Sequence, residues 1–209
     1  MKLYDYSGAP NPRRVRVFLA EKGVDVETVQ VNIFEKENLS PEFKAVNPRR
    51  IVPSLVLDDG TLIDESLAIC RYFEATHPEP ALFGATAKEQ GVIESWARRI
   101  EQDGFSQAAY VIRNENPRFV DRAVAGLTDC PQIPELTERG RKGLSAFYVT
   151  LNDQLAKSQY VAGDNYSVAD ITAMCAVDFG EFVGVAVPSH LTALASWRER
   201  MAARESSKA

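Results

Sequence analysis

Residues 51–67, IVPSLVLDDGTLIDESL, contain the two signals that decide the fold of the first part of the chain. Pro53 cannot donate to a β ladder and stands just before a strand pattern, so we expect a special turn with a cis Val52-Pro53 bond. Such a turn leaves the backbone N–H and C=O of Val52 free to pair with an extended peptide. Glu65-Ser66 then opens a helix, where unpaired N–H groups and the positive dipole end attract a carboxylate. Together these features predict an edge that binds an acidic peptide.

The rest of the first 80 residues alternates short strands with helices. Gly23 is a helix stop, Ser40-Pro41 a helix start, and the step Asp59-Gly60 a hairpin turn. The predicted order is βαβαββα, with a parallel first strand pair and an antiparallel hairpin at its end. The expected elements are strand 3–6, helix 12–22, strand 29–33, a short helix from residue 41 that ends before Asn47-Pro48, strands 55–57 and 61–63, and helix 66–76.

Composition and periodicity change near residue 80, after Pro78-Glu79-Pro80, and the remaining pattern is helical. The clearest helix start is Ser167-Val168-Ala169-Asp170, where serine and aspartate have capping-box spacing. We therefore expect an α/β domain at residues 1–80 and an all-helical domain at residues 86–209. The helices predicted in the second domain run from Thr86 toward Asn114 and over residues 118–128, 135–157, 168–183 and 189–204.

Composition narrows the possible functions. The 209 residues carry a net charge of −5, which argues against nucleic acid as the main partner. No apolar run approaches the ~18 residues that span a bilayer, and no signal-peptide core precedes the first strand, so we expect a cytoplasmic protein without a membrane partner. The three cysteines form no Cys-x-x-Cys pair, and the two histidines adjoin loop or helix ends. We therefore predict no disulfide framework and no metal site.

Four motifs occur together in this chain: Pro10-Asn11-Pro12-Arg13-Arg14-Val15, Val52-Pro53, Asp64-Glu65-Ser66, and the segment from Gly163 to Asp170. In this order and spacing they resemble the cytosolic glutathione S-transferases, of bacterial type, over essentially the whole chain. The resemblance implies a thioredoxin-like N-terminal domain, an all-α C-terminal helical bundle, glutathione as cofactor and a homodimer.

Such an enzyme must produce a thiolate, although a free thiol has a pKa near ~8.5. The loop before the first helix supplies hydrogen-bond donors at the positive end of that helix. These donors are the backbone amides of the loop and the side chains of Ser7 and Asn11. The family uses Tyr, Ser, Cys or Asn in this loop. Cysteine is excluded because the first one is Cys70, and Tyr4 and Tyr6 lie within the predicted strand. Asn11 is the preferred catalytic residue and Ser7 the second choice. The alternative is that Asn11 only caps the helix before Pro12.

The resemblance also implies how glutathione is held. Val52, next to Pro53, should pair with the cysteinyl backbone. Glu65 should accept from the γ-glutamyl ammonium, and Ser66 should donate to the γ-glutamyl carboxylate. Asp103 resembles an acidic residue that reaches the same ammonium across a dimer interface. The alternative for Glu65-Ser66 is a plain helix cap.

Two positions depart from the family pattern, because Ile51 stands where a glutamine is frequent and Leu39 where a lysine is frequent. The candidates that replace the missing positive charge for the glycyl carboxylate are Arg49, Arg50, Lys36 and Arg13. The pocket for a second substrate should lie between the domains. Its expected lining includes Tyr110 and Ile112 or Arg113.

The predicted function is a glutathione transferase that activates the thiolate for attack on a small electrophile. Two alternatives remain open at this point. One is a glutathione-dependent reductase of disulfides or peroxides, and the other is a scaffold that binds glutathione or a protein without turnover.

Overall fold

The computed structural model describes residues 1–209 and contains one four-stranded sheet in the order β2-β1-β3-β4. The strands are β1 (Lys2–Asp5), β2 (Thr28–Gln30), β3 (Ser54–Val56) and β4 (Leu62–Ile63). β1 is parallel to β2 and antiparallel to β3, and β3 is antiparallel to β4. The predicted order of elements along the chain, the parallel first pair and the antiparallel hairpin are therefore confirmed, and this mixed sheet with its helices is thioredoxin-like.

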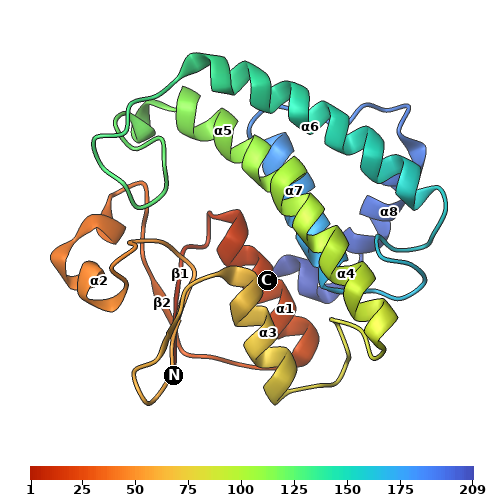
Figure 1. Ribbon diagram of the computed structural model, residues 1–209, viewed down its shortest axis with the longest axis horizontal. Helices are drawn as coiled ribbons and strands as arrows, with labels where there is room; N and C mark the ends of the chain where they lie inside the picture. The colour runs from red at the N-terminus through yellow and green to blue at the C-terminus, as the bar shows by residue number, and fades with distance from the viewer.

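Three helices complete the first part of the chain: α1 (Pro10–Lys22), α2 (Pro41–Val46) and α3 (Ser66–Thr76). Gly23 ends α1 in the left-handed conformation, with φ of 64°. Ser40 caps α2 by accepting a hydrogen bond from the Phe43 N–H at 3.1 Å. α1 and α3 pack side by side, and α1 also contacts the helical part of the molecule through α7 (Figure 1). The first turns of α1 and α3 lie next to each other, since the Ser66 hydroxyl donates to Asn11 Oδ1 at 3.4 Å.

β2 is shorter than the alternation at residues 29–33 predicts. Asn32 ends it, because its side-chain oxygen accepts hydrogen bonds from the N–H groups of Phe34 and Glu35 at 3.0 and 3.3 Å. A local turn of this kind competes with the strand ladder. The chain consequently leaves the sheet before Ile33.

All named elements after α3 are helical: α4 (Ala87–Ile100), a π-helical turn (Glu101–Phe105), α5 (Ser106–Glu115), α6 (Pro134–Leu155), α7 (Val168–Phe182) and α8 (Thr192–Ala202), with 3₁₀ turns at Pro117–Phe119 and Glu205–Lys208. A further 3₁₀ turn at Glu37–Leu39 precedes α2. The expected single helix from Thr86 toward Asn114 is thus interrupted by the π turn. Gly104 lies in this turn, and a Cβ there would come within 3.0 Å of Phe147 and 3.1 Å of Ala176. The interruption accordingly occurs where α6 and α7 pass very close to the backbone.

The predicted helix at residues 118–128 is wrong. After the short turn Pro117–Phe119, the chain forms an irregular loop in which Asp121, Gly126 and Asp129 have φ of 56°, 75° and 58°. A Cβ on Gly126 would lie 2.0 Å from the carbonyl oxygen of Arg49. The loop of residues 120–130 therefore rests directly on the N-terminal part of the chain, which requires glycine at this contact.

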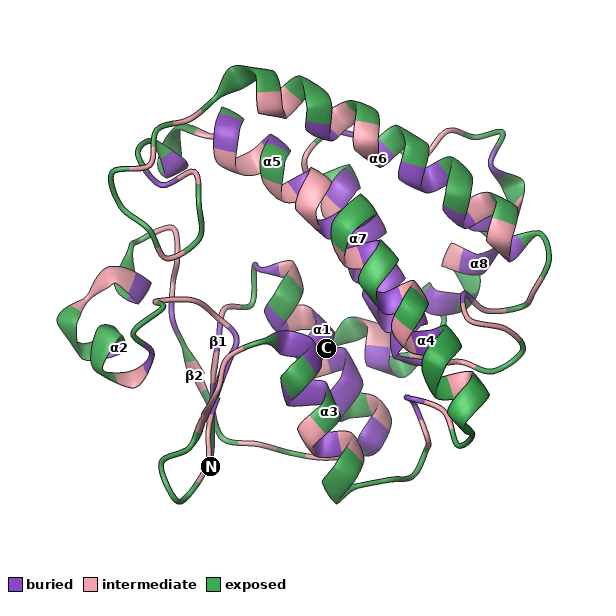
Figure 2. Ribbon diagram, viewed as in Figure 1, coloured by how far each residue is buried: buried purple, intermediate pink, exposed green.

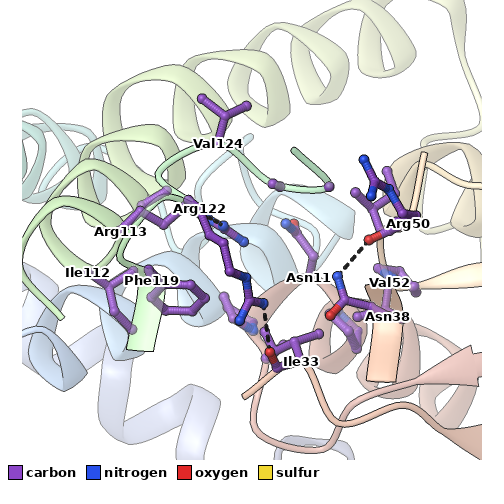
Figure 3. Close-up of a pocket in the computed structure, with 18 of the residues that line it drawn as sticks. Asn11, Ile33, Asn38, Arg50, Val52, Ile112, Arg113, Phe119, Arg122 and Val124 are labelled. Atoms are coloured by element: carbon purple, nitrogen blue, oxygen red, sulfur yellow. Dashed lines mark hydrogen bonds between the residues drawn. The ribbon is translucent and has the colours of Figure 1, made fainter. Parts of the chain in front are cut away.

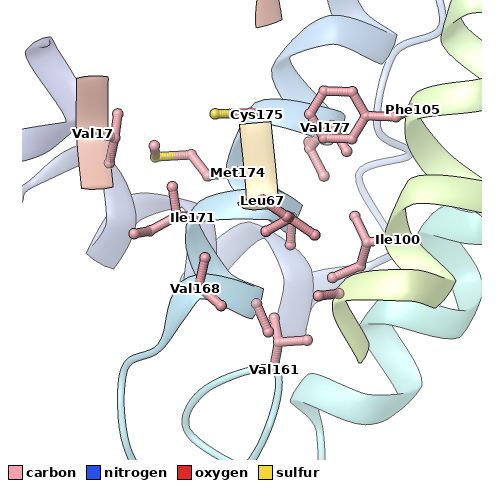
Figure 4. Close-up of a cluster of buried hydrophobic side chains, with 14 of the residues drawn as sticks. Val17, Leu67, Ile100, Phe105, Val161, Val168, Ile171, Met174, Cys175 and Val177 are labelled. Atoms are coloured by element: carbon pink, nitrogen blue, oxygen red, sulfur yellow. The ribbon is translucent and has the colours of Figure 1, made fainter. Parts of the chain in front are cut away.

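The hydrophobic core lies around α7, which is buried along most of its length (Figure 2). Figure 4 shows side chains from both parts of the chain in this cluster, among them Val17, Leu67, Ile100 and Ile171. At the start of α7 the Asp170 carboxylate accepts from the N–H groups of Val161 and Ser167 and from Trp197 Nε1, at 3.0 to 3.1 Å. The aspartate arm of the expected capping box is therefore formed, and burial raises the Asp170 pKa to about 6. Among the helices, none combines the length and the apolar character that crossing a membrane requires.

Candidate functional site

A cavity of about 430 Å³ opens between the two parts of the chain (Figure 3). Its first wall comes from the start of α1, the turn before β3 and the start of α3. Its second wall comes from α5, the end of α7 and the loop of residues 120–130. The lining residues are Gly8–Pro12, Ile33, Phe34, Asn38, Leu39, Arg49–Pro53, Asp64–Ser66, Ala109, Ile112, Arg113, Phe119, Arg122, Val124–Leu127, Phe179 and Phe182.

Val52 presents free backbone groups to this cavity. The bond between Val52 and Pro53 is cis, as the sequence predicts. Pairing within the sheet begins only at Ser54, and neither the N–H nor the C=O of Val52 takes part in a hydrogen bond. Such groups can add an extended peptide as one more strand.

The start of α3 supplies acidic and hydroxyl groups. Ser66 is the first residue of the helix and is buried, and its hydroxyl donates to Asn11 Oδ1 at 3.4 Å. The Glu65 side chain is 63% exposed and accepts from Arg49 Nη1 at 2.8 Å. The same Arg49 nitrogen donates to Asp64 at 3.1 Å. Arg49 thus orders both carboxylates at the mouth of the cavity.

Asn11 carries two unpaired donors at the positive end of α1. Pro10 and Pro12 have no N–H, Ala9 N–H donates to Tyr6, and Arg13 N–H donates to the Ala9 carbonyl. The Asn11 N–H is therefore the free backbone donor of this helix start. The Asn11 side-chain oxygen accepts from Arg14 Nη2 at 2.7 Å, which leaves its Nδ2 group without a partner. Both donors belong to a residue that lines the cavity.

Arg14 is fixed from the helical part of the molecule. It is 1% exposed, donates to Glu101 Oε1 at 2.8 Å, and stacks on the Phe105 ring with 4.4 Å to the centroid. A buried ion pair of this kind loses stability when either partner is removed. The orientation of the Asn11 amide therefore depends on residues of both parts of the chain.

Two of the predicted site residues lie outside the cavity. Ser7 does not line it; the Ser7 N–H donates to Gln30 at 3.0 Å and its carbonyl accepts from Arg16. Asp103 is exposed in the π-helical turn and is likewise not among the lining residues. The structure brings together Asn11, Val52, Pro53, Glu65 and Ser66.

Of the four candidate cations for a carboxylate, Arg49 and Arg50 line the cavity, whereas Lys36 and Arg13 do not. Arg50 has a left-handed backbone with φ of 56°, and its Nε is buried without a partner. Its carbonyl accepts from Asn38 Nδ2 at 2.9 Å, and the Asn38 Oδ1 is buried and unpaired. Sequence reasoning missed Asn38, because no motif distinguishes an asparagine in this loop.

The second wall was predicted in part. Ile112 and Arg113 line the cavity as expected. The prediction for Tyr110 is wrong, since this residue is 39% exposed and does not line the cavity. Phe119 and Arg122 were missed because residues 118–128 read as a helix. Arg122 Nη2 donates to the Ile33 carbonyl at 2.9 Å, which connects the loop to the N-terminal part of the chain (Figure 3).

Known proteins share both the sequence and the fold. Residues 3–81 match the family model described as "Glutathione S-transferase, N-terminal domain", and residues 130–205 match "Glutathione S-transferase, C-terminal domain". Over 100% of its length the chain is 35% identical to glutathione S-transferase 2 of Saccharomyces cerevisiae, covering 88% of that protein. A maleylacetoacetate isomerase of Pseudomonas aeruginosa is 40% identical over 69% of this chain and 84% of its own. The crystal structure of a glutathione S-transferase domain-containing protein from Marinobacter aquaeolei VT8 is 38% identical, with TM-score 0.91 and 99% of both chains covered.

Proposed function

This chain belongs to the glutathione S-transferase family and is an enzyme, and from that premise we propose that it activates the glutathione thiol for attack on a small electrophile. One observation carries the proposal: Asn11 has two unpaired donors at the start of α1, in the same cavity as the unpaired backbone of Val52. A peptide paired with Val52 would place a sulfur atom where those donors act on it.

The other groups of the cavity account for the rest of glutathione. In our proposal the cysteinyl backbone pairs with Val52, the γ-glutamyl carboxylate accepts from Ser66 at the start of α3, and Glu65 accepts from the ammonium. The glycyl carboxylate lies toward Asn38 and Arg50. In a homodimer, Asp103, which lies outside the cavity of its own chain, would approach the ammonium bound by the other copy. We assign this binding to residues 1–80 and the helical domain to residues 86–209.

The chemistry requires a lowered thiol pKa. Each pKa unit of depression needs ~1.4 kcal/mol of preferential stabilisation of the anion, and a hydrogen bond to a charged group contributes about 1.5–3 kcal/mol. The Asn11 side chain and backbone together are therefore sufficient to make the thiolate dominant at neutral pH. The thiolate forms a bond to the electrophilic carbon, the leaving group departs with its electron pair, and the thiol proton passes to solvent.

No protein thiol competes with glutathione at this position. Cys70 and Cys175 are buried in the core, and burial raises their pKa values to about 12 and about 11. Cys130, the third cysteine, is half-buried in the loop of residues 120–130, and none of the three cysteines lines the cavity. A reaction at this site must therefore use the sulfur of bound glutathione.

Calorimetry with glutathione, thiolate absorbance in the ultraviolet, and turnover of an aryl halide, a small disulfide and a peroxide test the proposal. We expect binding heat, a thiolate signal at neutral pH, and conjugation of the aryl halide. Faster turnover of the disulfide or peroxide would identify a reductase, and binding without any turnover would identify a scaffold. Absence of both binding heat and protection against melting would reject glutathione as the ligand.

A further inference from the structure

Two arginines of the cavity have no acidic partner. Arg113 extends from α5 and Arg122 from the loop of residues 120–130, and both side chains donate only to backbone carbonyls. The two carboxylates that line the cavity, Asp64 and Glu65, are both bound by Arg49 on the first wall. With Arg50 the lining holds four arginines against these two carboxylates. The cavity is therefore positively charged, although the whole chain has a net charge of −5.

Most of the donors of this arginine pair are unused. Arg113 Nη1 donates to the Arg122 carbonyl at 3.1 Å, and Arg122 donates to the carbonyls of Ile33 and Arg118 at 2.9 and 3.4 Å. A guanidinium has five N–H donors, so each side chain retains several for a ligand. Both guanidinium groups also lie over the Phe119 ring, at 4.7 and 5.6 Å from its centroid. Packing against Phe119 thus holds them in place before any ligand binds.

Without a bound anion, the two guanidinium groups of Arg113 and Arg122 repel each other. Burial and the neighbouring charge of Arg122 lower the pKa of Arg113 to about 10, so this side chain remains charged at neutral pH. Burial also lowers the pKa of Arg122, and an arginine guanidinium stays protonated in proteins. Two like charges in a partly buried place repel each other, and an anion between them removes that cost. Both positive charges would therefore stabilise a bound carboxylate.

The pair lies on the side of the cavity away from the proposed glutathione edge. In Figure 3, Arg113, Phe119 and Arg122 stand on one side and Val52 and Arg50 on the other, with Asn11 between them. Around the arginines the lining is apolar, and its contributors are Ile112, Phe119, Val124, Leu127, Phe179 and Phe182. This second wall offers a hydrophobic surface with a positive centre.

We propose that Arg113 and Arg122 bind a carboxylate of the second substrate, so that the preferred electrophile is a hydrophobic compound with an acid group. The inference rests on the proposed function, because it assigns glutathione to the first wall. Arginine suits this ligand because its planar fork matches both oxygens of a carboxylate. Phe119 and its apolar neighbours would contact the body of the electrophile.

Binding of product-like conjugates tests this without requiring turnover. S-(para-carboxybenzyl)glutathione and S-(para-carbamoylbenzyl)glutathione have nearly the same shape and differ in charge. By calorimetry, we expect the carboxyl conjugate to bind at least about tenfold more tightly than the carbamoyl conjugate. This difference in affinity should become smaller at high salt. Equal affinity of the two conjugates would overturn the inference.

Two arginine variants test whether the preference for the carboxyl conjugate depends on Arg113. Arg113→Gln should remove most of the preference for the carboxyl conjugate and leave the affinity for glutathione unchanged. Arg118→Gln is the matched control, because Arg118 lies next to the same loop, stacks on Phe34 and does not line the cavity. Arg113→Gln is the primary variant because the Arg122 side chain also donates to the Ile33 carbonyl, and its loss would affect the structure of the loop. The melting temperature of Arg113→Gln is compared with that of the control.

The outcomes separate the two proposals. If glutathione and the neutral conjugate bind but the carboxyl conjugate has no advantage, the inference fails and the proposed function stands. If Arg113→Gln loses affinity for glutathione itself, the arginines serve the glycyl carboxylate and the inference also fails. If glutathione and both conjugates fail to bind, both proposals are wrong.

Discussion

Arg14 donates from Nη2 to Oδ1 of Asn11 at 2.7 Å, and this bond leaves the Asn11 Nδ2 group as the free end of the amide. Arg14 is in turn paired with Glu101 at 2.8 Å, beyond the domain boundary. A residue at the start of α1 is therefore oriented by a charge that the helical domain holds in place. The proposed thiolate donor depends on this arrangement.

Asn11→Ala should raise the pKa of bound glutathione by about one to two units, because a hydrogen bond to the thiolate contributes about 1.5–3 kcal/mol. Thiolate absorbance as a function of pH measures the shift. Ser7→Ala is the control and should change nothing, since Ser7 lies outside the cavity. An unchanged thiolate signal in Asn11→Ala, with a loss in Ser7→Ala, would transfer the role to Ser7.

Arg14→Met should lower the free energy of unfolding by about 3 kcal/mol, the low end for breaking a buried ion pair, because Glu101 is 27% exposed. It should also shift the pH profile of kcat/KM upward, since Asn11 loses its orienting partner. Arg13→Met is the matched control: its pair with Asp178 is partly exposed and neither residue lines the cavity, so we expect about 1 kcal/mol or less and no pH shift. A destabilised Arg14→Met with an unaltered pH profile would show that Arg14 is only structural.

Glu65→Gln should weaken glutathione binding about tenfold, because an ammonium loses its carboxylate partner. N-acetylglutathione, which has no ammonium, should bind the variant and the unaltered protein equally. Calorimetry of both proteins with both ligands gives four affinities, from which the interaction between Glu65 and the ammonium is obtained. An equal loss for both ligands would mean that Glu65 acts only by ordering Arg49.

The two core thiols should make stability depend on pH above neutrality. Burial raises the pKa of Cys70 and Cys175 from 9.0 to about 12 and about 11, so the unfolded chain releases these protons at lower pH than the folded chain. The free energy of unfolding is therefore unaffected below about pH 9 and falls above it, by about 1.4 kcal/mol per thiol at pH 10. Urea unfolding of the unaltered protein and of Cys175→Ala measures this, and the variant should lose about half of the thiol contribution. The same decline in both proteins would contradict the prediction.

Asp170→Asn should destabilise the protein by about 3 kcal/mol. Val161 N–H and Trp197 Nε1 donate to Oδ1 and Ser167 N–H donates to Oδ2, so in either orientation of the amide an NH₂ group replaces an oxygen that accepts from an N–H donor. Asp153→Asn, at an exposed position of α6, is the matched control and should change the stability by less than ~0.5 kcal/mol. Chemical denaturation compares the two variants, and similar values for both would show that the buried network contributes little.

The sequence was most informative where structure is specified locally. Gly23, Ser40 and the Asp170 cap mark helix ends by short-range hydrogen bonding or by backbone preference, and the structure has helix ends at all three. The cis Val52-Pro53 bond was predictable for the same reason, since proline restricts its own neighbourhood. The turn before β3, which belongs to the first wall of the cavity, follows from this last signal.

The second wall was less predictable, because contacts distant in sequence determine it. Residues 118–128 have a helix-like composition, but Gly126 meets the Arg49 carbonyl and Arg122 meets the Ile33 carbonyl. Asn38 likewise acquires its position only through the Arg50 carbonyl. Periodicity reports which face of an element is buried and contains no information about such contacts.

The loop of residues 120–130 lines the cavity, yet no helix or strand belongs to it. Apart from Arg122, which is bonded to the Ile33 carbonyl, evolution can therefore exchange its side chains, and with them the range of molecules accepted, at little cost to the rest of the protein. A mutational library aimed at new substrates should begin there and keep Gly126, the residue that seats the loop.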